Sequence, residues 1–185
     1  EYQMHPRANP ERREAREGRS RQPGGRTMEI QRLVGRGLRS AFDLKTLGAR
    51  TITIDCDVLE ADGGTRTASV TAGWMATVAA LYRLGLAGVL RDHVAAISVG
   101  HVDGEVRVDL DYEEDVAAGV DMNVVSTRAG KLIEVQATAE GPPIARDDFD
   151  RMLSAALSSI ESLCALQVEA LTSAGVDVEI LKKRA

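Results

Sequence analysis

Apolar residues recur along this chain either in three- and four-residue steps or in steps of two, and each change of period marks an expected element. Residues 27–42 follow the first pattern, which predicts an amphipathic helix with Thr27 as its cap. Residues 51–58 alternate polar with apolar residues, which predicts a half-buried strand. Residues 65–86 are apolar almost all round, so we expect a central helix that is packed on several sides.

Two turn signals divide the following sequence into pairs of strands. Asp103-Gly104 suits the positive φ angles of a tight hairpin turn, and Ala129-Gly130 separates a second pair of β-rich segments. A long amphipathic helix is expected to begin after Asp148, with acidic residues near its positive end. Strands that lie between and beside helices favour a layered α+β or α/β domain.

Composition adds an uneven distribution of charge to this picture. The 185 residues are 44% hydrophobic with a net charge of −5, yet residues 1–39 hold ten arginines against five acidic residues. We therefore expect a basic arm over residues 5–25 that contacts RNA phosphates, although an ordinary solvated segment would have the same composition. The chain contains no apolar run of membrane-spanning length and no secretory signal, so we expect a cytoplasmic protein with no membrane partner.

The stretch ADGGTRTAS, residues 61–69, places two glycines before Thr65 and Arg66 at the start of the central helix. Such a turn presents unpaired backbone N–H groups, the positive end of the helix dipole and a guanidinium, which together suit a phosphate. A tight turn with a threonine cap and a solvated arginine would use the same residues. Arg26 also follows two glycines before a helix start, so it is a second candidate for the same anion.

The stretch DLDYEEDVAAGVDMN, residues 109–123, is a dense acidic run between two expected strands. Its carboxylates lie at positions 109, 111, 113, 114, 115 and 121. Carboxylates this close repel one another, so they are solvated, partly protonated or neutralised by a hard cation such as Mg²⁺ or Mn²⁺. A solvated acidic loop between strands is the commoner explanation, since the run lacks the spacing of a calcium-binding loop.

Four segments together resemble, in order and spacing, the signature segments of the ribonuclease PH family. They are GGRTMEIQRLVGRGLRS, TITIDCDVLEADGGTRTASVTAGW, DLDYEEDVAAGVDMNVV and IEVQATAEG. The resemblance covers nearly the whole chain. It implies one α+β domain over residues 1–185, of the ribosomal protein S5 domain 2-like type, with a mixed sheet packed against helices. It also implies that family members carry further strands before Glu1, so we expect one open sheet edge.

The resemblance further implies an enzyme, a phosphate-dependent nucleotidyltransferase that acts as a phosphorolytic 3′ to 5′ exoribonuclease. Such an enzyme trims tRNA precursors and other RNA 3′ ends with inorganic phosphate as co-substrate and releases nucleoside diphosphates. The family assembles as a homo-oligomer, a hexameric ring built as a trimer of dimers. The alternative is a catalytically silent RNA-binding ring subunit of an exosome-like assembly, which typically lacks part of the site described next.

The site residues that the resemblance implies fall into three groups. The phosphate-binding group is Arg26, Gly64, Thr65 and Arg66. Asp115 and Asp121 are the expected catalytic residues and the expected ligands of Mg²⁺ or Mn²⁺. The expected RNA-binding residues of the basic arm are Arg7, Arg12, Arg13 and Arg16.

Overall fold

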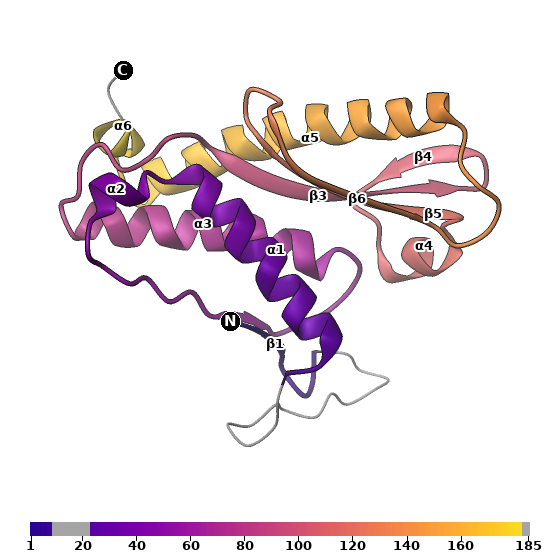
Figure 1. Cartoon of the computed structure of the whole chain (residues 1–185), viewed down its shortest axis with the longest axis horizontal. Helices are drawn as coiled ribbons and strands as arrows, with labels where there is room; N and C mark the ends of the chain where they lie inside the picture. The colour runs from indigo at the N-terminus through magenta and orange to yellow at the C-terminus, as the bar shows by residue number, and fades with distance from the viewer. Residues whose placement is uncertain (9–22, 183–185) are drawn as a thin grey trace.

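A computed structural model describes residues 1–8 and 23–182 of the chain. Helices and strands alternate through this part of the sequence, and Figure 1 shows their arrangement. In chain order they are β1 Tyr2–Met4, α1 Gly25–Ala41, α2 Leu44–Leu47, β2 Cys56–Val58, α3 Thr65–Arg83, β3 Val94–Val102, β4 Glu105–Val108, α4 Tyr112–Ala117, β5 Val120–Thr127, β6 Leu132–Ala139, α5 Arg146–Ser173 and α6 Val178–Leu181.

Four of the strands form an antiparallel sheet in the order β4-β3-β5-β6. In the pairing of β3 with β5, Val94 lies opposite Thr127 and Gly100 lies opposite Asp121. The strands β1 and β2 form a separate parallel pair. The expected α+β architecture is therefore confirmed, and within the described residues its parallel and antiparallel pairings belong to two different sheets.

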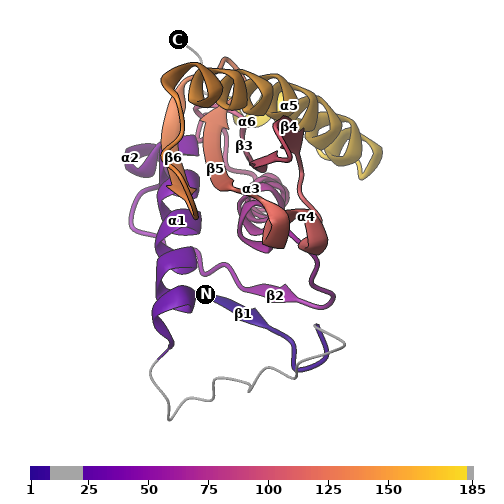
Figure 2. The same ribbon diagram turned by 90° about the vertical axis from the view of Figure 1, so that its right-hand side faces the viewer.

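Helices cover both faces of the antiparallel sheet. Figure 2 shows α5 along one face, α1 and α3 on the other, and the β1–β2 pair beyond α1 and α3. The alternation of side chains along β3 explains this layering, since Val94 joins the core beneath α1 and α3 whereas Ile97 joins the core beneath α5. The buried face of α5 repeats at four-residue steps, through Met152, Ala156, Ile160 and Cys164.

Both predicted hairpin turns are present. Asp103 and Gly104 adopt φ angles of 51° and 85° between β3 and β4. Two successive residues with positive φ give the turn whose twist matches that of the flanking strands. Gly130, with a φ of 76°, lies in the turn between β5 and β6.

Four predicted boundaries were wrong. The central helix α3 ends at Arg83 and not at residue 86. Helix α1 begins at Gly25 with Gly24 in the cap position, so Thr27 lies within the first turn rather than capping it. Helix α5 begins at Arg146, which places Asp148 inside the first turn, where the helix dipole favours an acidic residue. Exposure alternates throughout residues 51–58, but only the β2 residues pair as a strand, because the parallel partner β1 is three residues long.

A search of the helices that the structure describes found none with the length and apolar character needed to cross a lipid bilayer.

The contact of α5 with the sheet gives a test of the core. Ile160 is fully buried against the sheet, so Ile160→Ala should lower the free energy of unfolding by about 2–5 kcal/mol. Leu166 lies on the same helix with 59% of its surface exposed, and Leu166→Ala should lower it by less than about 1 kcal/mol. Urea unfolding of both variants measures the difference. Equal losses would contradict the orientation of α5.

Candidate active site

The first turn of α3 is open to an anion. Gly64 occupies the cap position with a left-handed φ of 68°, and no side chain caps the helix there. The helical backbone bond from Ala68 N–H to the Gly64 carbonyl measures 3.0 Å, so the N–H groups of residues 65–67 precede it and have no intrahelical acceptor. These groups and the helix dipole favour a negative charge at this end of α3.

The two glycines before α3 have different roles. Gly64 adopts the left-handed conformation that begins the helix. Gly63 allows a close backbone approach, because a Cβ atom at this position would lie 1.9 Å from the carbonyl oxygen of Leu110. The neighbouring Asp62 reinforces the approach, since its Oδ1 accepts a hydrogen bond of 2.6 Å from the Tyr112 N–H. The start of α3 is therefore fixed against the acidic segment.

The acidic segment contains helix α4 and is not the simple loop that its composition suggested. Asp111 caps this helix by accepting a hydrogen bond of 2.8 Å from the Glu114 N–H, and Glu114 accepts one from the Asp111 N–H. This reciprocal capping box explains why an acidic run becomes helical. Glu114 also accepts a hydrogen bond of 2.7 Å from Arg107. Asp111 and Glu114 thus support the local fold, whereas Asp115 is exposed on α4.

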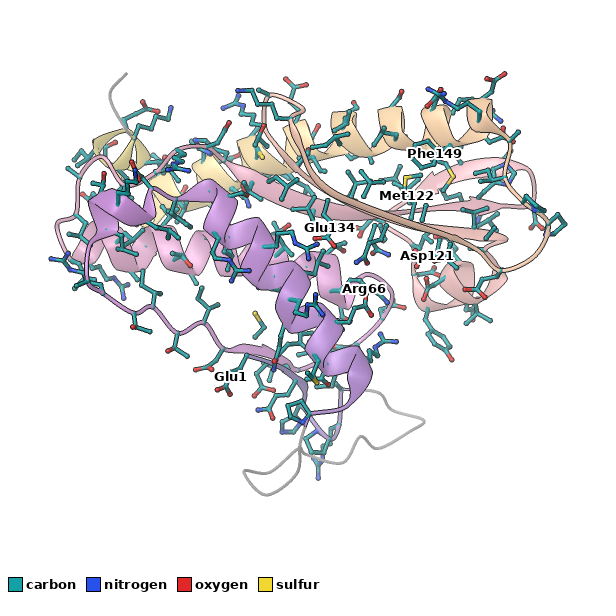
Figure 3. The ribbon with its side chains drawn as sticks, viewed as in Figure 1. Glu1, Arg66, Asp121, Met122, Glu134 and Phe149 are labelled. Carbon is teal, nitrogen blue, oxygen red and sulfur yellow. The ribbon has the colours of Figure 1, made fainter. Side chains whose placement is uncertain are left out.

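Asp121 lies on β5, where opposing influences act on the pKa of its carboxyl. Burial and then the charge of Asp115 raise the pKa of the Asp121 carboxyl, while Arg66 and a hydrogen bond from Asn123 lower it. The Asn123 Nδ2 donates to both carboxylate oxygens, at 3.3 and 3.1 Å, and Asn123 is only 4% exposed. Figure 3 shows Arg66 and Asp121 in the same part of the molecule. The structure thus brings Arg66, Asp115 and Asp121 within electrostatic range of one another.

The predicted phosphate residues are brought together in part. The Arg66 Nη1 lies 3.4 Å from the Glu29 Oε1, so Arg66 reaches the turn of α1 that follows Arg26. Arg26 itself is exposed at the second position of α1. The Thr65 hydroxyl lies 3.0 Å from the Tyr2 hydroxyl, so its side chain is hydrogen-bonded to β1. Thr65 therefore offers its backbone N–H to an anion.

The predicted RNA-binding arginines are only partly described. Arg7 is exposed, and its backbone N–H donates to the His5 Nδ1 at 3.3 Å. The next residue, Ala8, accepts a backbone hydrogen bond of 2.7 Å from Ala61, so this segment lies against the chain that leads into α3. The other three predicted residues, Arg12, Arg13 and Arg16, lie outside the described residues.

Sequence reasoning missed three residues that shape this site. Asn123 lies two positions after Asp121, and the period of a strand places both on one face, so the sequence contained that signal. Glu29 lies one helical turn after Arg26, which is also a local signal. Tyr2 contacts Thr65 across 63 positions of sequence, and no local pattern indicates that contact.

The donor set fits a divalent cation of the Mg²⁺ type. In residues 1–8 and 23–182, no group of three or more His, Cys, Asp or Glu side chains is arranged to hold a metal ion. Asp115 and Asp121 nevertheless form a carboxylate pair in which one raises the pKa of the other. Mg²⁺ is commonly held by one or two carboxylates together with water and substrate phosphates, and it would relieve this repulsion.

A cavity of about 540 Å³ borders the site, but the charged side chains of the site do not line it. It lies between the 54–60 segment and α3, and its lining includes Gly63 and Thr65. None of Arg66, Asp115 and Asp121 lines it. We therefore locate the site by its charged groups and open helix turn rather than by this cavity.

Comparisons with known proteins agree along nearly the whole chain. Residues 1–86 match the model of the 3′ exoribonuclease family, domain 1, and residues 92–159 match domain 2 of the same family. Ribonuclease PH of Nocardia farcinica is 52% identical over 177 residues, which cover 92% of this chain and 68% of that protein. Ribonuclease PH of Moorella thermoacetica is 53% identical over 178 residues, which cover 92% of this chain and 70% of that protein.

A solved structure supports the fold at lower sequence identity. An Archaeoglobus fulgidus exosome with RNA bound to the active site matches with a TM-score of 0.66 and 20% identity. The match covers 89% of this chain and 68% of that one.

The contact at Gly63 gives a first test of the site. The Cβ atom of Gly63→Ala would meet the Leu110 carbonyl at 1.9 Å, so the backbone must shift and the free energy of unfolding should fall by roughly 1–3 kcal/mol. Gly141→Ala meets no atom within 4 Å and should change it by less than about 0.5 kcal/mol. Chemical denaturation compares the two. An unaffected Gly63→Ala variant would show that the close approach is not needed.

The raised pKa of Asp121 gives a second test. Because the pKa of Asp121 is raised in the folded protein, protonated Asp121 contributes stability. This contribution is fully present below the ordinary carboxyl pKa, and it is lost as the pH rises through the raised pKa. Asp121→Asn should therefore unfold at a higher temperature than the wild type at pH 7, and the gain should disappear as the pH falls through the pKa of Asp121. Thermal unfolding without metal or phosphate measures this, with the exposed Asp103→Asn as control. A gain that persists at low pH would contradict the assignment.

Proposed function

Because this chain belongs to the 3′ exoribonuclease family, the family of ribonuclease PH, we propose that it shortens RNA from the 3′ end by phosphorolysis. One observation carries the proposal. The uncapped first turn of α3 and the Arg66 guanidinium offer an anion site, and they lie beside the carboxylates of Asp115 and Asp121. An enzyme that brings inorganic phosphate to a phosphodiester needs both halves of this arrangement.

The proposed reaction joins two anions, and the cationic half of the site lowers the repulsion between them. An oxygen of inorganic phosphate attacks the phosphorus of the terminal phosphodiester, a new P–O–P bond forms, and the bond to the preceding ribose 3′-oxygen breaks. The products are a nucleoside diphosphate and an RNA shorter by one nucleotide. Arg66 and the backbone N–H groups of residues 65–67 stabilise the attacking phosphate, and Arg26 is the second arginine that we propose for it.

The carboxylates serve the leaving side of the reaction. The departing 3′-oxygen needs a proton, and a carboxyl group with a raised pKa holds one more readily than an ordinary aspartate. We assign this role to the Asp115–Asp121 pair, because burial and mutual repulsion raise the pKa of Asp121. Asn123 keeps the Asp121 carboxylate in one orientation through its two hydrogen bonds.

Asp115 and Asp121 are also the residues that we propose to hold Mg²⁺ or Mn²⁺. Metal ligands are deprotonated, so a carboxylate that is bound to the ion does not donate the proton, and the two roles are alternatives for each residue. When bound, the ion would neutralise charge on the phosphates of the substrate. The proposal does not depend on which of the two ions is used.

We also propose which RNA this protein acts on and how its subunits assemble. We propose tRNA precursors as substrates in the cytoplasm, held by a basic arm that includes Arg7, Arg12, Arg13 and Arg16. Arginines along such an arm bind phosphates without reading bases, so this contact is electrostatic. We also propose a hexameric ring, a trimer of dimers, as the working assembly. The alternative, a silent RNA-binding subunit, is disfavoured because Arg26, Arg66, Asp115 and Asp121 are all retained.

The proposal is tested on a tRNA with a 3′ extension, incubated with the full-length protein with and without inorganic phosphate. Nucleoside diphosphates should appear only with phosphate. Arg66→Ala should reduce their release roughly 100-fold or more, because it removes a cationic contact to the reacting phosphate. Arg83→Ala, an exposed arginine at the other end of α3, is the matched control and should retain activity.

Three results would contradict the proposal. Monophosphates released without phosphate would indicate hydrolysis. RNA binding without any product would indicate the silent subunit. Full activity of Arg66→Ala would remove this residue from the reaction.

A further inference from the structure

A second cavity, lined largely by charged residues, lies at the end of the antiparallel sheet opposite Asp121. It has a volume of about 400 Å³, and we call it the His93 pocket. His93 directly precedes β3, and the six residue steps from Val94 to Gly100, the partner of Asp121, span about 20 Å. Figure 1 shows this end of the sheet beside α6, away from α4. The charged residues in its lining are Arg91, Asp92, Arg128, Glu161 and Lys182.

His93 is the unusual residue in this lining. It is only 5% exposed, and neither its Nδ1 nor its Nε2 has a hydrogen-bond partner within the described chain. Its backbone is fixed by bonds from His93 N–H to Asp92 Oδ1 at 2.8 Å and from Arg128 N–H to the His93 carbonyl at 3.0 Å. The ring packs against Trp74 at a centroid distance of 5.0 Å. Buried polar groups are rarely left unpaired, so this unpaired imidazole in the lining of the pocket is a candidate to bind a ligand.

Charged groups of both signs surround His93. Burial, then Lys182 and Arg128, lower the pKa of His93, while Asp92 and Glu179 act in the opposite direction. Two of these groups have partners, because Asp92 accepts the His93 N–H and Lys182 pairs with Glu179.

Two further arginines differ in their freedom to bind a ligand. Arg91 is paired with the buried Asp43 at 3.2 Å. Arg128 is exposed in the turn after β5, and in the described part of the chain its side chain makes no hydrogen bond or ion pair. Arg128 is therefore the cation that is free to bind, and Glu161 on α5 is the carboxylate that opposes it.

We propose that the His93 pocket binds an oxyanion of the phosphate class, held by the Arg128 guanidinium and a ring N–H of His93. This site is separate from the proposed active site and does not depend on it. Two sources share this chemistry, inorganic phosphate and the terminal phosphate of a nucleotide. A bound phosphate supplies the acceptor that the buried imidazole lacks and the counter-charge that Arg128 lacks.

The test uses NMR spectra of the histidine rings in the full chain. Added inorganic phosphate should move the His93 resonance in a saturable way and raise its pKa, because a neighbouring anion favours the protonated ring. Chloride at equal ionic strength should not. His93→Gln assigns the resonance, and His5→Gln with His101→Gln assign it by elimination should that variant not fold. Repeating the titration with ADP shows which of the two sources the pocket prefers, since the ligand with the lower dissociation constant is the one that the site selects.

Two matched variants separate a specific site from general attraction of anions. Arg128→Ala should weaken phosphate binding at the His93 resonance roughly tenfold or more. Lys131→Ala removes an exposed cation from the same turn, outside the pocket lining, and should leave the affinity unchanged. Arg66→Ala should also leave it unchanged, which distinguishes this site from the proposed active site. A His93 resonance that follows ionic strength alone, or equal binding by Arg128→Ala and wild type, would overturn the proposal.

Discussion

The backbone contact between Gly63 and Leu110 decides where the charged halves of the site meet. Any side chain at Gly63 would overlap the Leu110 carbonyl, so only glycine lets the start of α3 approach the acidic segment this closely. The bond from Tyr112 to Asp62 and the capping box of α4 then fix the acidic segment in place. The open N–H groups and the carboxylates are therefore positioned by rigid backbone, which reproduces a geometry better than long side chains do.

In the free protein, the surroundings of Asp121 disfavour its ionised form. Burial and Asp115 both oppose ionisation of Asp121, whereas Arg66 and Asn123 favour it. Arg66 is weakly paired with Glu29 on α1, since the Arg66 Nη1 and the Glu29 Oε1 lie 3.4 Å apart and the Glu29 side chain is 45% exposed. Ion pairs of this kind contribute little, so a phosphate can take the place of Glu29 at modest cost. Interactions left unsatisfied in the free protein are typical of sites that bind charged ligands.

The sequence predicted most of the elements because their signals are local. The hairpin turns at Asp103-Gly104 and Ala129-Gly130 are indicated by glycines, which readily adopt positive φ angles. The helix over residues 146–173 is indicated by the spacing of the apolar residues on its buried face. The extent of β2 could not be predicted, since it depends on a partner more than 50 positions away. The conversion of the acidic run to helix α4 was missed, although the capping pair Asp111 and Glu114 was present in the sequence.

For the candidate site, the sequence identified the charges but not the constraints that place them. Arg66 was a candidate from the stretch of residues 61–69 itself, and the family resemblance singled out Asp115 and Asp121 within the acidic run. The structure adds that Asp115 raises and Arg66 lowers the pKa of Asp121. The predicted phosphate group included Gly64 but not Gly63, and the structure shows that Gly63 makes room for another segment of backbone. Telling these two uses of glycine apart requires three-dimensional contacts, because both select the same residue type.

Contacts far from the charges also determine the geometry of the site. The buried Gln167 on α5 donates hydrogen bonds to the carbonyls of Thr71 on α3, at 3.3 Å, and Val94 on β3, at 3.2 Å. It thus joins the helix that carries Arg66 to the strand that pairs with the Asp121 strand. Because α3 is a continuous helix, a rotation at Thr71 would move its first turn relative to β5. Displacements of about 1 Å are enough to impair catalysis, so the interior of α5 is part of what makes the site work.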